Sequence, residues 1–167
     1  RAAVDALGKL NGTVVVAGLT TGQAEATKLI ADLRLTPHTE SESLLIRKFN
    51  HDGKLVVLAS GADARGLMYA LLDVADRVAW ARSEEGVFSE VRDVQEMPFT
   101  PERALSIYTF NRAYWESRFY DEAYWARYLE VLAQNRFNSL VVIFGYENGG
   151  FLAPCYPYFF DVAGFPG

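Results

Sequence analysis

The sequence contains little cysteine and little histidine, and these shortages exclude several kinds of site. Cys155 is the single cysteine among 167 residues, so the chain can form no internal disulfide and no thiolate metal cluster. The two histidines, His38 and His51, lie in polar, turn-like sequence that is typical of surface positions. A histidine-based zinc site or a Ser-His-Asp triad is therefore not expected, and we predict neither a metal nor a cofactor.

Positive charge and long apolar runs are also lacking. The 16 Lys and Arg residues are outnumbered by 21 Asp and Glu, giving a net charge of −5. Proteins that bind nucleic acids or anionic membranes present a basic face, so neither is expected as the main partner of this chain. No apolar run approaches the roughly 20 residues of a membrane span. What remains is a globular composition, 50% hydrophobic and 22% charged.

The first half of the chain has the pattern of a small α/β domain. Apolar periodicity predicts, in chain order, a short helix at 1–10, a strand at 14–19, a helix after Gly22, strands at 43–49 and 55–59, and a helix within 61–81. Asp52-Gly53 suits a hairpin turn between the two later strands. The buried stripe expected for the last helix comprises Leu67, Met68, Leu71, Leu72, Ala75, Val78 and Ala79. We expect a βαββα domain over residues 1–95, its sheet covered by two helices on one face.

The second half predicts one parallel β-α-β unit. Residues 82–101 are polar and proline-marked, like a linker, and are followed by a strand at 104–110, a helix from Asp121 and a strand at 140–144. The expected buried helix face comprises Tyr124, Trp125, Tyr128, Leu129, Leu132 and Ala133. Parallel strands are normally buried on both faces. We therefore expect this chain to be the N-terminal part of a longer protein, or to complete its fold with a partner.

Three segments carry a resemblance to known enzymes. "GADARGLMYALLDVADRV" resembles the last helix of the small domain that precedes the catalytic barrel in family 20 and family 67 glycoside hydrolases, the β-hexosaminidases and α-glucuronidases. "PERALSIYTFNRAYW" and "YLEVLAQNRFNSLVVIFGYE" resemble the first elements of that barrel. The resemblance implies an accessory domain at 1–95 and an incomplete (β/α)₈ barrel at 96–167. By the same analogy, it implies secretion or a periplasmic location.

The resemblance also implies a carbohydrate substrate and a place for its binding site. Active sites of such barrels form at the C-terminal ends of the strands. Asn111 and Arg112 follow the first expected strand, and Tyr146, Glu147 and Asn148 follow the second. Amides and carboxylates bind sugar hydroxyls, and an arginine fork suits a uronate carboxylate. The catalytic acids of these families lie on later strands, so we assign no catalytic residue here and expect the isolated chain to be inactive without the remainder of its barrel.

Several alternatives stay open at this stage. Glu147 is either a sugar ligand, a solvated loop acid or the partner of a nearby arginine. The aromatic residues Tyr114, Trp115, Phe119 and Tyr120 either stack on sugars or pack in a core, and packing is the commoner use of such residues. A non-catalytic carbohydrate-binding or interaction module is the main rival to a hydrolase. A nucleotide-binding protein is a weaker one, because "GLTTGQ" matches neither phosphate-binding motif.

Overall fold

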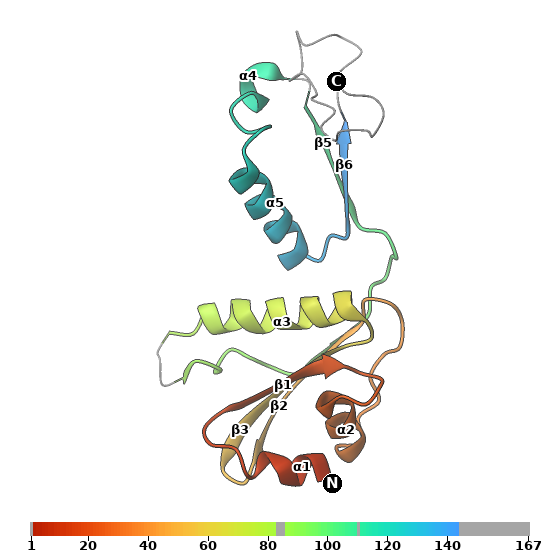
Figure 1. Cartoon of the computed structure of the whole chain (residues 1–167), viewed down its shortest axis with the longest axis vertical. Helices are drawn as coiled ribbons and strands as arrows, with labels where there is room; N and C mark the ends of the chain where they lie inside the picture. Colours follow the sequence, from red (N-terminus) through yellow and green to blue (C-terminus); the bar gives the residue numbers. More distant parts are fainter. Residues whose placement is uncertain (1, 83–85, 110, 144–167) are drawn as a thin grey trace, which may run out of the picture. The chain divides into compact units, whose positions relative to one another are not determined.

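The computed structural model describes residues 2–82, 86–109 and 111–143. The chain divides into two compact units between Pro101 and Glu102, and each is described by itself. This boundary lies six residues beyond the end of the domain predicted at 1–95. The described part is mixed α/β, with a four-stranded mixed sheet in the first unit and a two-stranded sheet in the second (Figure 1).

The first unit is built on a sheet with the strand order β1-β3-β2-β4. Its elements are α1 (Ala2–Leu7), β1 (Val14–Leu19), α2 (Glu25–Asp32), β2 (Leu44–His51), β3 (Lys54–Gly61), α3 (Ala64–Ala79) and β4 (Val94–Glu96). β1 pairs with β3 in parallel, whereas β2 is antiparallel to both β3 and β4. The chain therefore leaves β1, crosses to β2 through α2, and returns through a hairpin to place β3 in the middle of the sheet.

The hairpin between β2 and β3 forms where the sequence predicts it. His51 pairs with Lys54, so the turn consists of Asp52 and Gly53 alone. Both residues have positive φ, 49° and 75°. A two-residue turn with two positive φ values matches the right-handed twist of the flanking strands, and Asp-Gly adopts it at low cost.

The helices of this unit cover opposite faces of the sheet, so the prediction that two helices share one face is wrong for α2 and α3. Alternate strand residues face two separate cores, with Val56 and Leu58 on one side and Val57 and Ala59 on the other. The first core includes α1 and α2, and the second includes α3 (Figure 1). Periodicity did not reveal this because the buried strands are apolar at consecutive positions, as strands covered on both faces are.

Helix α3 is also rotated from the predicted orientation. Its buried residues are Gly66, Tyr69, Ala70 and Val74, and none of them belongs to the predicted stripe. Two glycines explain the difference. A Cβ on Gly66 would lie 2.2 Å from the Ser43 carbonyl oxygen, and a Cβ on Gly61 would lie 1.9 Å from the Leu67 nitrogen. Backbone approaches this close require glycine, so the small face of the helix meets the sheet.

The second unit contains β5 (Ala104–Tyr108), α4 (Arg112–Trp115), α5 (Glu122–Gln134) and β6 (Ser139–Ile143). β5 and β6 pair in parallel, with Ala104 opposite Ser139 and Tyr108 opposite Ile143. α5 connects the two strands and begins at an Asp121 cap, whose side chain accepts a hydrogen bond from the Tyr124 N–H. The β-α-β order predicted for this part of the chain is therefore present.

Candidate functional site

The carboxyl ends of β5 and β6 are held together by Thr109. Its N–H and its hydroxyl both donate to the Ile143 carbonyl oxygen, at 3.0 and 3.2 Å, and Thr109 is fully buried. The Trp115 indole N–H donates to the Tyr108 carbonyl oxygen at 2.9 Å. These bonds fix α4 directly after the end of β5. The residues that follow β5 are thereby positioned by the sheet itself.

Asn111 is the one predicted site residue whose side chain the structure describes. It is exposed, its side-chain oxygen accepts a hydrogen bond from the Tyr114 N–H at 3.2 Å, and its backbone carbonyl accepts one from the Trp115 N–H at 3.0 Å. Asn111 thus begins α4 as a helix cap. Among the described residues, none accepts a hydrogen bond from its side-chain NH₂ group.

The other predicted site residues lie wholly or partly outside the described residues. Arg112 is the first residue of α4, but only its backbone is described. Tyr146, Glu147 and Asn148 lie outside the described residues altogether. The predicted contact of Arg112 and these three residues with a sugar therefore stays a prediction.

Aromatic rings surround the junction of α4 and α5. Trp115 stacks on Trp125 with 5.9 Å between the ring centroids and an interplanar angle of 8°. Tyr124 meets both indoles edge to face, and Tyr128 stacks on Tyr124. Trp115 is buried, and the Trp125 indole N–H donates to the Phe119 carbonyl oxygen. Trp115 and Trp125 therefore pack within the protein. Burial and the neighbouring Tyr124 and Tyr114 raise the pKa of Tyr128 above its ordinary value.

Tyr114 differs from these packed rings because 51% of it is exposed. The Arg118 guanidinium lies over the Tyr114 ring, 4.4 Å from its centroid, and donates a hydrogen bond to the Tyr114 carbonyl oxygen at 2.6 Å. Tyr120 is similarly exposed, at 56%. Of the four aromatic residues whose use the sequence left open, Trp115 is a core residue, whereas Tyr114 and Tyr120 present surface that a sugar ring can contact.

A polar cluster in the first unit was not among the predicted sites. Asp63 caps α3 by accepting from the Gly66 N–H at 2.8 Å, and it also accepts from the Ser41 hydroxyl at 2.7 Å and the Glu42 N–H at 2.9 Å. The Arg65 guanidinium donates to the buried Glu42 carboxylate at 2.5 Å. The sequence contains a signal for this cap, because Asp is a preferred N-cap residue and Asp63 lies at the start of the predicted helical segment at 61–81.

The charges and hydrogen bonds of this cluster indicate a structural role. We call the group formed by Ser41, Glu42, Asp63 and Arg65 the clasp. Burial of Asp63 raises its pKa, but hydrogen bonds from Gly66, Ser41, Glu42 and Arg65 outweigh that effect and hold the pKa below its ordinary value. The hydrogen bond to Glu42, together with its negative charge, raises the pKa of Arg65. Glu42 has a positive φ of 65°, which these bonds stabilise. Each polar group here already has a partner within the protein, so the cluster fixes the start of α3 against β2.

The described residues contain no group of three or more His, Cys, Asp and Glu residues that could hold a metal ion. Within the same residues, no helix combines the length and the apolarity that crossing a membrane requires.

No protein-family model matches the sequence, and no curated protein matches it significantly.

Proposed function

We propose that this chain is part of a carbohydrate-active glycoside hydrolase similar to families 20 and 67. In this proposal, the first unit is the βαββα accessory domain, and the second unit forms the first elements of a (β/α)₈ catalytic barrel. The substrate is an oligo- or polysaccharide, and a uronic acid within it would suit Arg112. The catalytic acids would be supplied by later strands of the barrel.

The observation that carries the proposal is the group of residues at the end of β5. β5, α5 and β6 form a parallel β-α-β unit, the repeating element of such barrels. Immediately after β5, the chain presents the Asn111 side chain and the half-exposed Tyr114 ring. An amide donor beside an aromatic ring is a common combination in sugar binding, because the amide reaches hydroxyl groups while the ring contacts the apolar face of the sugar.

The exposure of the strands also favours a larger barrel. Tyr108 on β5 is exposed, and Val141 on β6 is 43% exposed. Parallel sheets are stable when helices cover both faces and neighbouring strands cover both edges. In the described part of the second unit, α5 is the one long helix available for this purpose. Further strands and helices of a barrel would bury these apolar side chains.

The proposed chemistry of the site is substrate positioning. Arg112 would grip a uronate carboxylate through two parallel N–H donors, which a lysine at the same position could not do. Asn111 would donate to a hydroxyl group, and Tyr146, Glu147 and Asn148 would extend the site from the end of β6. Glycoside hydrolysis additionally needs a pair of carboxyl groups, or one acid assisted by the substrate. We therefore expect no turnover by the 167-residue chain.

A non-catalytic carbohydrate-binding module is the second candidate. The observation that favours it is the pair formed by the exposed Tyr114 ring and the Arg118 guanidinium above it. Such a surface can bind an acidic sugar without any chemistry. This candidate and the hydrolase differ in turnover, not in binding.

The test uses the 167-residue chain and the full-length protein together. Tryptophan fluorescence reports binding, because the Tyr114 ring lies 5.3 Å from Trp115. The titrants are uronate-containing xylo-oligosaccharides, their neutral counterparts and chito-oligosaccharides. We expect R112K to weaken uronate binding about tenfold, a loss of about 1.4 kcal/mol, and to leave neutral sugars unaffected. R127K is the matched control, since Arg127 lies exposed on α5 in an ion pair with Glu130.

Each result points to one conclusion. Sugar release by the full-length protein, with binding but no turnover by the 167-residue chain, supports the hydrolase. Binding by both proteins with no turnover by either supports the binding module. If neither protein binds any of these sugars, the carbohydrate proposal is wrong.

A further inference from the structure

Strand β1 forms one edge of the four-stranded sheet, and half of its backbone groups face away from the sheet. The Thr20 N–H donates to the Gly61 carbonyl oxygen at 2.9 Å, and the Gly18 carbonyl accepts from the Ser60 hydroxyl at 2.7 Å. Even-numbered residues of β1 therefore face β3. Because successive residues of a strand alternate in direction, the N–H and C=O groups of Val15 and Ala17 point to the free edge. They have no partner among the described residues.

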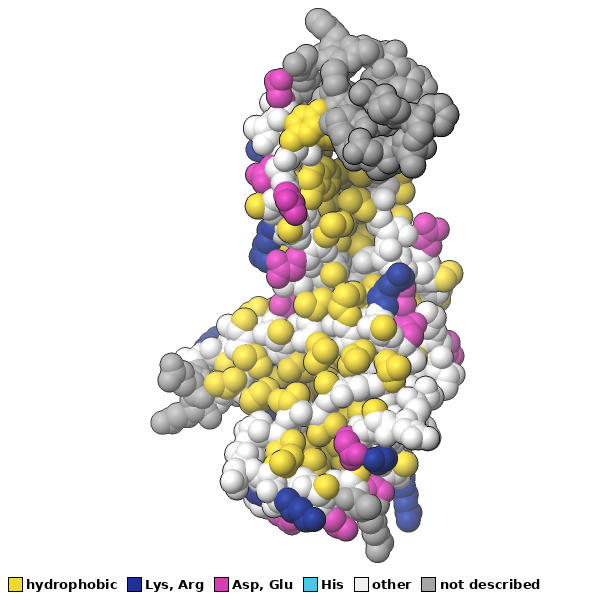
Figure 2. Space-filling model, in the orientation of Figure 1, with side chains coloured by type: hydrophobic (Ala, Val, Ile, Leu, Met, Phe, Trp, Pro, Cys, Tyr) yellow, Lys and Arg dark blue, Asp and Glu magenta, His cyan; other side chains and the backbone are white. Residues whose placement is uncertain are grey.

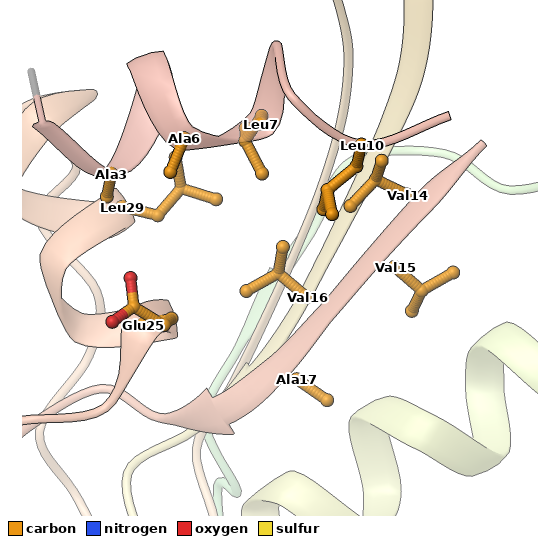
Figure 3. Close-up of a pocket in the computed structure, with 10 residues that line it drawn as sticks. All are labelled: Ala3, Ala6, Leu7, Leu10, Val14, Val15, Val16, Ala17, Glu25 and Leu29. Carbon is orange, nitrogen blue, oxygen red and sulfur yellow. The ribbon is translucent and has the colours of Figure 1, made fainter. Parts of the chain in front are cut away.

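The surface on one side of this edge is an apolar groove. It has a volume of about 390 Å³ and lies between α1, β1 and α2. The side chains of Leu10, Val14 and Val16 point into it, whereas those of Val15 and Ala17 point to the other face of β1 (Figure 3). Glu25 is the one charged residue of its lining, and it is paired with Lys28 at 2.5 Å. A strand placed against β1 would therefore meet an apolar surface.

The surface on the other side of β1 is apolar as well. The side chains of Val15, Ala17 and Leu19 are all exposed, and 47% of Val15 is accessible. On α3, Met68 and Leu71 are exposed too. Figure 2 shows hydrophobic side chains gathered over α3 and the neighbouring strand. The free edge thus has apolar side chains on both of its faces.

The opposite edge of the sheet is protected in a way that β1 is not. β4 has three residues, and Asp93 just before it binds the Arg47 guanidinium at 3.2 Å and the Lys48 N–H at 2.8 Å. A short strand with charged neighbours is the usual protection against pairing with another chain. β1 is twice as long, has the sequence VVVAGL and carries no charge.

We propose that β1 pairs in antiparallel fashion with β1 of a second copy of this chain, around a two-fold axis at Val16. In this register, Val15 of each copy lies opposite Ala17 of the other. The outward N–H and C=O groups of these residues then satisfy one another as hydrogen-bonded pairs. Val14 of each copy lies opposite Gly18 of the other, where no side chain obstructs it. The two four-stranded sheets become one continuous sheet.

The pattern of charge and hydrogen bonding favours a second copy over an unrelated strand. A two-fold contact brings identical residues near one another, so any charge on the edge would repel its own copy. β1 has none, and the Glu25–Lys28 pair next to it is neutral overall. The free backbone groups of the two copies are also complementary, because Val15 and Ala17 are two residues apart with the two-fold axis between them. The Leu19 carbonyl, which would extend the ladder, is already occupied by the Thr27 hydroxyl at 3.0 Å.

The experiment measures the mass of the 167-residue chain by light scattering during size-exclusion chromatography. It is performed under reducing conditions so that Cys155 cannot cross-link copies. We expect a dimer at about 100 μM, a concentration far above a micromolar dissociation constant. A17P should give a monomer with an unchanged circular dichroism spectrum, because Ala17 donates no hydrogen bond to β3 and proline is tolerated on a free edge.

Two lysine substitutions distinguish this interface from association through the second unit. V15K should weaken the dimer at least tenfold, since it brings positive charges together on an apolar edge. V141K is the matched control, because Val141 is a strand valine of similar exposure on β6. It should leave the dimer unchanged. A monomeric wild type, a dimer that survives both A17P and V15K, or a dimer lost only in V141K would each overturn the proposal.

Discussion

The two units contain similar apolar strands but bury them to very different degrees. In β3, Val57 and Leu58 have no exposed surface. In β5 and β6, every residue is at least partly exposed. The difference does not come from composition, because VVLAS in β3 and SLVVI in β6 are equally apolar. It comes from the neighbouring elements. β3 lies between two strands and has helices on both faces, whereas in the described part of the second unit β5 and β6 have one another as their strand neighbours.

In its described part, the second unit buries apolar side chains of α4 and α5 rather than apolar strand residues. Trp115 and Leu132 are its buried apolar residues in the described part, and Trp115 contacts three other rings. The comparison therefore predicts a different source of stability in each unit. The sheet should dominate in the first, and the rings of α4 and α5 should dominate in the second.

The largest expected effect is that of W115A. Removing this indole deletes the stack on Trp125 and the hydrogen bond to the Tyr108 carbonyl, so we expect a loss of about 3–5 kcal/mol in the free energy of unfolding. Y114A, at the exposed neighbouring ring, should cost about 0.5–1.5 kcal/mol. Urea unfolding followed by near-UV circular dichroism measures both. Equal losses would mean that the ring cluster is not the core of this unit.

A leucine pair tests the comparison directly between the units. L58A removes a fully buried side chain from the middle of the first sheet and should cost about 2–5 kcal/mol. L129A makes the same chemical change on α5, where 51% of the leucine is exposed, and should stay within about 0.5 kcal/mol. Thermal and urea unfolding measure the difference. A large effect of L129A would show that further parts of the protein cover α5.

Local signals in the sequence were sufficient for most of the elements but not for their packing. The prediction of a linker over 82–101 is wrong in part, because β4 lies within it and pairs with β2, a contact between residues far apart in the sequence. The Asp52-Gly53 turn and the strand Val14–Leu19 could be predicted because turn chemistry and apolar runs act over a few residues. The orientation of α3 could not. Its large apolar residues predict one buried face, but the contact of Gly66 with the Ser43 carbonyl joins residues 23 positions apart and selects another. Periodicity carries no information about such a contact.

The candidate site shows the same limit. The position of Asn111 after β5 follows from the strand prediction, and its role as a cap follows from its residue type. The different exposure of Trp115 and Tyr114 does not follow from the sequence. Both are aromatic neighbours in the sequence, and only the position of Trp125 decides that one ring is buried and the other exposed. The sequence alone therefore favoured packing for both rings and left sugar binding open for both.

The two long helices offer a matched pair of caps. Asp63 begins α3 and accepts from Gly66, Ser41 and Glu42, whereas Asp121 begins α5 and caps it through the Tyr124 N–H at 3.1 Å. Loss of a cap usually costs about 0.5–2 kcal/mol. We expect D63A near the upper end of this range, because it also frees Ser41 and Glu42, and D121A near the lower end. Urea unfolding measures both, and a larger loss for D121A would contradict the clasp.

The same clasp predicts a small dependence of stability on pH. Hydrogen bonds hold the Asp63 pKa below its ordinary value despite burial, so its ionised form binds better in the folded state than in the unfolded chain. This stabilisation is fully present above the unfolded pKa of about 3.9 and is lost as the pH falls through the lower folded pKa. D63N keeps a cap but removes the charge. Its stability should therefore fall below that of the wild type at neutral pH and converge with it in acid, as measured by urea midpoints across this range. A constant difference at every pH would show that the Asp63 charge contributes nothing to the clasp, and that hydrogen-bond geometry alone fixes α3 against β2.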